Sequence, residues 1–363
     1  AAPSTARPSS RRETTNKKRG PRGPPFCVMA SPAGYRLGGA LSKPADAAIR
    51  SKFAPQPPTA LSSPLMASLP LLLALLSPPL SAQDRPFGLE APGDTPVVFA
   101  PGVVSKTDEH EFGITISPDG TEVLWAVTLD GRNDLRLRRF ADGAWQEEKT
   151  LFLELDRTNF DPFHSRDGKR LFFLSRKHGE MEGSNPDLWV ADKTDDGYAN
   201  PRPLGRPPNS TALEFFVSEA ADGTLYFASN RDRSGRDFDI FRTRPLGDGT
   251  YGEPELVPGD LNTPWYEADT YVAPDQSYLL VSAARRDGRG KADLYFSTRR
   301  DDGTFTEAQT FDERISTEGH EICPYVSPDG RWFFFSRDGD VYWVLAEPVL
   351  KNARAIWTAK SGH

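Results

Sequence analysis

The chain has 363 residues, a formal net charge of −7 and a hydrophobic content of 37%. The charge is uneven: residues 1–65 carry 11 Lys and Arg against two acids, which leaves residues 66–363 with a net charge of −16. So acidic a domain argues against nucleic acid or an anionic membrane as its partner. The two cysteines, Cys27 and Cys323, fall on opposite sides of this boundary, which excludes a disulfide framework for the acidic part.

Residues 1–65 are rich in Pro, Ser and Ala and have no hydrophobic period, a composition that predicts a disordered leader. Residues 66–82 contain an apolar run too short to span a bilayer and end in small residues, as a secretory signal peptide does. We therefore expect export to the periplasm or secretion, with no transmembrane segment in the mature chain. A start codon assigned upstream of Met66 would explain the leader most simply.

A tetrad built around Asp-Gly recurs five times in the acidic part, at residues 117–120, 165–168, 220–223, 273–276 and 327–330. Successive tetrad aspartates are 48, 55, 53 and 54 residues apart. This is the period of one four-stranded propeller blade and is too long for a single hairpin. The spacing therefore predicts five blades.

Each tetrad precedes a short β-branched and aromatic run, such as residues 170–174 or 331–335, which predicts a buried strand. A later aspartate opens another run in each repeat and predicts a third strand, at Asp134, Asp187, Asp239, Asp293 and Asp340. In the first four repeats a second Asp-Gly turn and an aromatic follow, as at residues 248–251. Because Asp-Gly supplies the positive φ of tight hairpins, this turn predicts a fourth strand.

The fifth repeat lacks such a turn, whereas residues 96–105 supply an unassigned β-like run before the first tetrad. A closed ring must pair its first and last blades to remove its sheet edges. We therefore predict an all-β fold, a five-bladed β-propeller of four-stranded antiparallel blades over residues 96–345. Its ring is expected to close through an N-terminal strand that joins the last blade, with residues 346–363 as a C-terminal tail.

The repeats resemble the TolB-type, WD-repeat-like propeller family over residues 96–345. The resemblance is carried by the Ser-Pro-Asp-Gly tetrads and, in the third repeat, by residues 226–231 leading to residues 239–241. The chain departs from the family pattern at residues 220–221 and at Gln276. The resemblance implies a propeller that binds a partner, and, less commonly, a peptidase-associated domain or a polysaccharide lyase.

One face of the predicted ring, here called the mouth, collects the residues that precede the first strand and follow the second strand of each blade. Eight residues before the tetrad aspartates stand Glu111, Asn159, Glu214, Glu267 and Glu321. The segments after the second strands add Arg176, Arg231, Arg285 and Arg337 to the same rim. One interpretation is a ring of ion pairs and backbone caps that ties neighbouring blades together. The other is a polar ligand-binding site at the end of the channel.

Three histidines stand beside these rim residues, namely His110, His178 and His320. They belong to consecutive blades of the closed ring, so we expect all three at the mouth. Imidazole and carboxylate together suit a transition metal or general acid–base chemistry. The cofactor is therefore either none or a divalent cation. His164 and Cys323 fall on inner strands and are expected to be structural.

We expect an exported binding module that takes a protein or carbohydrate ligand at the glutamate-lined mouth and performs no chemistry. The alternative is an extracytoplasmic carbohydrate-active enzyme, a lyase or a glycoside hydrolase, which needs two carboxylates facing each other across the substrate. A binding ring should pair its glutamates with Arg176, Arg231 or Arg337. A catalytic site should instead leave His110, His320 and a carboxylate converging on an open pocket.

Overall fold

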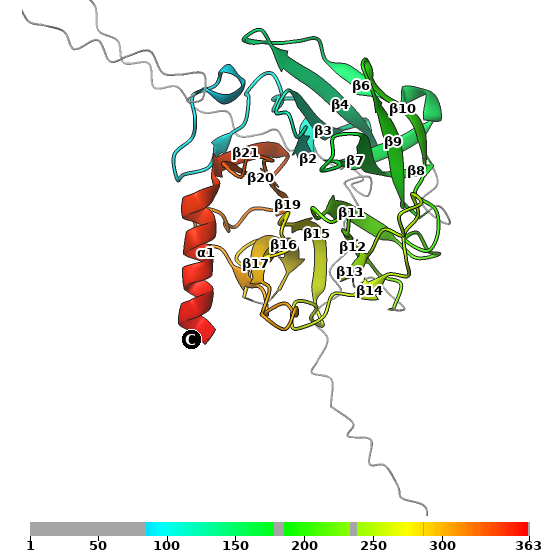
Figure 1. The fold of residues 1–363 in the computed structure, drawn as a ribbon. Coiled ribbons are helices and arrows are strands. Elements are labelled where there is room, and N and C mark those ends of the chain that lie inside the picture. Colours follow the sequence, from blue (N-terminus) through cyan, green and yellow to red (C-terminus); the bar gives the residue numbers. More distant parts are fainter. Residues whose placement is uncertain (1–84, 178–184, 233–237, 286, 362–363) are drawn as a thin grey trace, which may run out of the picture. The chain divides into compact units, whose positions relative to one another are not determined.

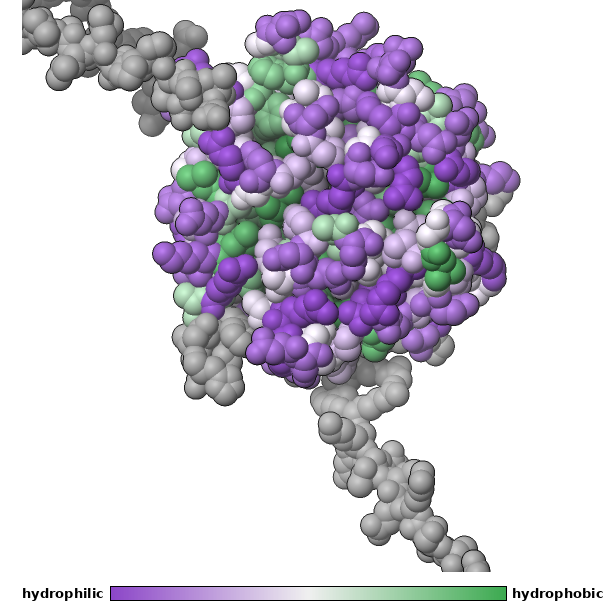
Figure 2. Space-filling model, viewed as in Figure 1, coloured by the Kyte–Doolittle hydropathy of each residue, from purple (hydrophilic) through white to green (hydrophobic). Residues whose placement is uncertain are grey.

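The structure is a computed structural model that describes residues 85–177, 185–232, 238–285 and 287–361. It contains five antiparallel sheets arranged in a ring (Figure 1), so the predicted all-β, five-bladed propeller is confirmed. The expected leader, residues 1–65, and the expected signal peptide, residues 66–82, lie outside the described residues. The face seen in Figure 2 is mostly hydrophilic.

The innermost strand of each blade runs beside the ring axis (Figure 1); these strands are β2 (His110–Ile116), β7 (Arg157–His164), β11 (Glu214–Glu219), β15 (Tyr266–Val272) and β19 (Glu321–Val326). Each contains a β-bulge, where two of its residues oppose one residue of the second strand. The first bulge residue has a left-handed backbone in every blade, with φ from 42° to 59°: Gly113, Asp161, Phe216, Asp269 and Cys323. That conformation is uncommon for residues other than glycine and draws attention to these positions.

The second strands are buried over most of their length, as their apolar runs predict; they are β3 (Glu122–Leu129), β8 (Arg170–Lys177), β12 (Leu225–Ser229), β16 (Tyr278–Ala284) and β20 (Trp332–Arg337). The third strands are β4 (Arg132–Ala141), β9 (Asp187–Thr194), β13 (Asp239–Thr243), β17 (Asp293–Thr298) and β21 (Asp340–Leu345). Four of these begin at the predicted aspartate, and β4 begins two residues before Asp134.

The outer strands are β5 (Ala144–Trp145), β6 (Lys149–Leu151), β10 (Gly197–Pro203), β14 (Glu255–Leu256) and β18 (Gln309–Thr310). All of them except β10 have only two or three residues and are shorter than the turn pattern suggests. In blades 3 and 4 the turn aromatic, Tyr251 or Phe305, is buried, and the paired segment starts four residues later. In blade 1 the short β5 closes a hairpin and β6 then pairs separately with β4, which gives this sheet five strands.

The N-terminal strand closes the ring as predicted. Strand β1 (Val97–Val98) pairs with β21 in the register Val97↔Trp343 and Val98↔Tyr342. The Phe99 N–H then donates to the Val341 carbonyl at 2.8 Å. The strand is shorter than the β-like run at residues 96–105, because Ala100 adopts a left-handed backbone (φ 44°) and the chain turns away from β21.

Helix α1 (Ala346–Ser361) occupies the region predicted as a C-terminal tail and lies along the outside of the ring beside β17 and β21 (Figure 1). Its side chains Val349 and Ala353 are buried. Two short 3₁₀ turns, η2 (Pro86–Gly88) and η3 (Leu153–Leu155), complete the helical elements of the described chain. No helix among the described residues has the length and apolarity needed to cross a bilayer.

Candidate functional site

The four predicted mouth glutamates are completely buried, and their backbone links neighbouring blades. Each donates its N–H to a carbonyl of the preceding blade around the ring: Glu111 to Gly339 at 2.9 Å, Glu214 to Pro186 at 3.4 Å, Glu267 to Phe238 at 3.3 Å and Glu321 to Ala292 at 3.0 Å. A repeated position therefore makes a repeated contact between blades.

Three of the glutamate side chains form buried ion pairs with the rim arginines: Glu214–Arg231 at 3.1 Å, Glu267–Arg285 at 3.1 Å and Glu321–Arg337 at 2.8 Å. A hydroxyl four residues before each glutamate also donates to its carboxylate, from Ser210, Thr263 and Thr317 respectively. These carboxylates are therefore already bound inside the protein, by the arginine and by the hydroxyl group of the segment that precedes the glutamate. The geometry is that of the ring of ion pairs and backbone caps.

Blades 1 and 2 depart from this pattern. The Glu111 carboxylate accepts the Lys106 N–H at 3.0 Å, and the Asn159 amide oxygen accepts the Ser175 hydroxyl at 2.7 Å. Arg176 of blade 2 is half-buried, and within the described part of the chain its guanidinium has no hydrogen bond or ion pair. Burial lowers the pKa of the Arg176 guanidinium. This rim arginine differs from Arg231 and Arg337 because its blade carries Asn159 in place of glutamate.

Glu267 gives the ring a predicted pH dependence. Burial raises the pKa of Glu267 to about 7, although Arg285 and Thr263 lower it. A carboxyl whose pKa is raised on folding stabilises the protein below its unfolded pKa, and that contribution is lost as the pH rises towards 7. We expect the free energy of unfolding to fall between about pH 4.5 and 7 by at most about 1.4 kcal/mol per pH unit from this group.

Urea unfolding at several pH values checks this expectation. Glu267→Gln should flatten the decline, whereas Glu313→Gln, at a glutamate whose side chain is 79% exposed, should leave it unchanged. Equal slopes in the wild-type protein and Glu267→Gln would contradict the assignment.

The predicted histidines do not form a metal centre within the described chain. His110 is exposed and lies against Gly339, where any Cβ would overlap its Nδ1. His320 is half-buried, and burial lowers its pKa although Asp269 and Asp338 raise it. His178 lies outside the described residues. Among residues that the structure describes, no group of three or more His, Cys, Asp or Glu side chains is arranged to hold a metal ion.

The other two inner-strand residues are buried. His164 is hydrogen-bonded to the Tyr198 hydroxyl at 2.8 Å, and burial lowers its pKa to about 4. Cys323 is a buried free thiol, and burial raises its pKa well above the usual value.

A carboxylate pair that the sequence analysis missed lies at the axis. Asp161 and Asp269 occupy the left-handed bulge position of blades 2 and 4, which are not neighbours in the ring. Burial, and then the Asp269 carboxylate, raise the pKa of Asp161 well above its usual value. The Asp269 carboxylate accepts the Ser282 hydroxyl at 2.7 Å and the Cys323 N–H at 3.4 Å. An aspartate six residues before two of the tetrad aspartates was the available sequence signal.

The two aspartates differ in their partners. The Asp161 side chain is only 5% exposed, and no hydrogen-bond donor to it is found within the described residues. A Cβ built on Gly113 would lie 3.1 Å from Asp161 Oδ1, so the carboxylate is directed towards blade 1, and Gly113 leaves the room for it. We call Asp161, Asp269, Gly113 and Cys323 the axial layer.

Aromatic side chains fill the axis on the tetrad side of this layer. Tyr325 of blade 5 contacts Phe163 of blade 2 and Tyr271 of blade 4, with ring centroids 6.1 and 5.7 Å apart. The Arg166 guanidinium lies over the Phe163 and Tyr271 rings and donates to the Glu219 and Val272 carbonyls at 2.8 and 3.0 Å. We call these four side chains the aromatic floor. Because the aromatic floor fills the axis on the tetrad side, the mouth is the side from which a ligand could approach the axial layer.

Tyr325 also bridges the closing seam of the ring. Its hydroxyl accepts the Ile116 N–H at 3.1 Å and donates to the Ile116 carbonyl at 3.0 Å. Tyr325→Phe is expected to lower the free energy of unfolding by about 1–3 kcal/mol, because two buried backbone groups lose their partner. Urea unfolding measures this, with Tyr251→Phe, whose hydroxyl lies 3.5 Å from Arg170, as the matched control. Equal losses in the two variants would contradict a special role of the seam.

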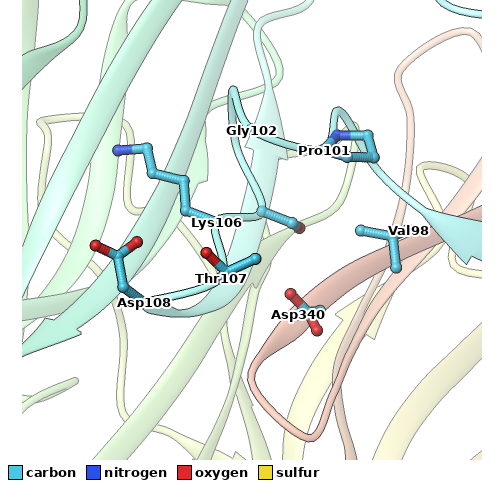
Figure 3. Close-up of a pocket in the computed structure, with 8 residues that line it drawn as sticks. Val98, Pro101, Gly102, Lys106, Thr107, Asp108 and Asp340 are labelled. Atoms are coloured by element: carbon cyan, nitrogen blue, oxygen red, sulfur yellow. The ribbon is translucent and has the colours of Figure 1, made fainter. Parts of the chain in front are cut away.

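A shallow hollow of about 560 Å³ lies at the ring-closure seam, away from the axis (Figure 3). Lys106 and Asp108 lie on one side of it and Val98 and Pro101 on the other. Lys106 Nζ is already paired with Glu109 and Glu148, each at 3.2 Å. The Lys106 ammonium is therefore already occupied, and the hollow does not contain the axial layer.

The fold defines the chain as a five-bladed β-propeller. No protein-family model and no curated protein matches it. It is similar to solved structures that include TolB from Acinetobacter baumannii (17% identity, TM-score 0.42, covering 66% of this chain and 55% of that one) and a putative TolB from Agrobacterium tumefaciens (16%, 0.44, 64% and 71%). A thermostable family-43 glycoside hydrolase is also similar (13%, 0.47, 68% and 91%). The chain spans about half the length of the Acinetobacter protein, and at these identities the likeness concerns the fold alone.

Proposed function

We propose that the protein is a binding module whose site is the axial layer, reached from the mouth, and that it performs no chemistry on its ligand. The observation that carries the proposal is the Asp161 carboxylate, which is buried beside Asp269 without a hydrogen-bond donor among the described residues. Neither Asp161 oxygen is among the fully buried unpartnered polar atoms of the described residues, so solvent reaches the carboxylate, and a ligand donor could take the place of that water. A polar ligand, carbohydrate or peptide, would supply that partner.

The surroundings support the same assignment. Three of the four mouth glutamates are paired with Arg231, Arg285 and Arg337, so they serve as a rigid frame for the site. Arg176 is the rim arginine without a carboxylate partner in the described residues, and we assign it to the ligand. Because the aromatic floor fills the opposite side of the axis, approach from the mouth is the route that we propose.

The binding proposal is tested by thermal melts of the full chain with cello-, xylo- and chito-tetraose and with a set of tripeptides. At least one probe should raise the melting temperature of the wild-type protein, and Asp161→Asn and Asp269→Asn should abolish the shift. Asp248→Asn, at an exposed turn, is the control. If no probe gives a shift that depends on Asp161 or Asp269, the proposal fails.

A second candidate is a glycoside hydrolase or lyase, which one observation favours. Asp269 accepts two hydrogen bonds and Asp161 accepts none from the described residues, and such unequal surroundings separate a general acid from a general base. Incubation with p-nitrophenyl glycosides and with uronic-acid oligosaccharides decides between the two. We expect no turnover; turnover that disappears in both Asp161→Asn and Asp269→Asn would replace the binding module by the enzyme.

The proposal includes a location outside the cytoplasm, periplasmic or secreted, which rests on the signal-like residues 66–82. Expression of the coding sequence in a bacterial host should yield an exported protein whose N-terminus is Gln83. An unprocessed protein that stays in the cytoplasm would contradict this part of the proposal and leave the axial site untouched.

A further inference from the structure

A hydrogen-bonded chain of three titratable side chains joins blades 1 and 2 on the tetrad side of the ring. Glu122 begins strand β3 of blade 1, whereas His164 ends β7 and Tyr198 lies on β10 of blade 2. The Tyr198 hydroxyl donates to Glu122 Oε2 at 3.4 Å and lies 2.8 Å from His164 Nδ1. Glu122 and His164 are only 2% and 3% exposed. The two blades are therefore connected through groups that water hardly reaches.

The charges around this chain are nearly balanced. Glu122 Oε1 accepts hydrogen bonds from Lys193 Nζ at 2.6 Å and from Arg139 Nε at 2.7 Å. Although burial raises the pKa of Glu122, these two hydrogen bonds lower it, so the carboxylate stays ionised. The exposed Asp119 is the other carboxylate that acts on His164. A positive charge on His164 would leave these described groups with three cations and two carboxylates.

The hydrogen-bond partners determine where the protons lie. An ionised Glu122 can only accept, so the single hydroxyl proton of Tyr198 is donated to it. The Tyr198 oxygen then accepts from His164, which places the proton of the neutral ring on Nδ1. His164 Nε2 is buried and has no hydrogen-bond partner among the described residues. A second proton would have to occupy Nε2, and a buried donor without an acceptor is unfavourable.

We infer that Glu122, Tyr198 and His164 form an acid-sensitive brace, which holds blades 1 and 2 together only while His164 is neutral. Protonation of Nε2 creates both the unpartnered donor and the unbalanced charge. The ring escapes both by moving to water, which breaks its contact with Tyr198. The His164 backbone N–H also donates to Thr115 Oγ1 of blade 1 at 3.2 Å, so movement of His164 loosens a second contact between the blades. Acid should therefore open this junction locally.

The buried position of His164 sets the pH range of the brace. Burial lowers the pKa of His164 from its ordinary value of 6.5 to about 4, although Glu122 raises it. A group whose pKa is lowered on folding stabilises the protein above its unfolded pKa, and this contribution is lost as the pH falls from about 6.5 to 4. Over these roughly 2.5 pH units, the equilibrium constant for unfolding should rise about 300-fold because of this group.

Urea unfolding of the full chain between pH 7 and pH 4 tests the brace. His164→Asn keeps a side-chain N–H near the position of Nδ1 and cannot be protonated, so its unfolding constant should rise about 300-fold less than that of the wild-type protein. His110→Asn, at an exposed histidine of blade 1, is the matched control and should follow wild type. Comparison at equal pH cancels the contributions of other groups, such as Glu267. Identical pH profiles in wild type and His164→Asn would overturn the inference.

Two measurements on the wild-type protein keep the inference testable if His164→Asn does not fold. NMR of the His164 ring nitrogens at pH 7 should show the proton on Nδ1 and none on Nε2, and the opposite tautomer would contradict the brace. Hydrogen exchange, corrected for its intrinsic pH dependence, should show at least tenfold less protection of β10 at pH 4.5 than at pH 7. Strand β17 of blade 4 is the reference. An equal loss in both strands would mean global acid unfolding and would also overturn the inference.

Discussion

Phe99→Ala is expected to lower the free energy of unfolding by about 3–5 kcal/mol, the range for truncation of a buried aromatic side chain. Phe99 follows strand β1 and is completely buried, with its ring centroid 5.1 Å from that of Phe334 and 5.2 Å from that of Trp343. These partners belong to the last blade. The substitution therefore leaves a cavity at the place where the N-terminal strand closes the ring.

Urea unfolding followed by tryptophan fluorescence measures this loss. Val97→Ala, in the same strand but 44% exposed, is the matched control and should change the free energy by no more than about 0.5 kcal/mol. Comparable losses in the two variants would mean that Phe99 does not anchor the closure.

Deletion of residues 96–105 should have a larger effect of the same kind. It removes the partner of β21 and leaves that strand as an open sheet edge, which promotes aggregation and loss of cooperative unfolding. A deletion variant with an unchanged melting transition would refute closure by this strand.

Arg337→Leu should destabilise the protein by about 3–5 kcal/mol, because it removes one partner of a buried ion pair. The Glu321 carboxylate is completely buried and lies 2.8 Å from Arg337 Nε. Arg337 also donates to the carbonyls of Arg314 and Ile315 at 3.1 and 2.9 Å, so it holds the connection that leads into the last blade.

An exposed pair provides the control for this variant. The Arg202 and Asp192 side chains are 50% and 41% exposed at a separation of 3.0 Å, and Arg202→Ala should cost about 1 kcal/mol or less. Adding Glu321→Gln to Arg337→Leu should recover part of the loss, since the uncompensated charge is removed, and the double-mutant cycle gives the coupling. No recovery would show that the loss comes from the carbonyl contacts alone.

The local chemistry of the sequence was sufficient to predict the blades. Asp-Gly turns require positive φ, and the apolar runs after the tetrads can only be buried strands, so five repeats and their second and third strands follow from neighbouring residues. Closure through residues 97–98 was also predictable, because the last repeat lacks an outer strand and a ring must leave no edge. The outer strands were less predictable. Tyr251 and Phe305 are buried after their turns, so the outer strands of blades 3 and 4 begin four residues further along the chain.

The direction of the inner-strand side chains could be decided only by the tertiary structure. Counting residues identified Glu214, Glu267 and Glu321 as equivalent, but their carboxylates meet arginines and hydroxyls from segments whose spatial position depends on how the blades pack. Asp161 and Asp269 were passed over because a β-bulge interrupts the alternation of side chains in each inner strand. A bulge is visible in strand pairing and not in composition, and the meeting of blades 2 and 4 at the axis depends on the closed ring as a whole.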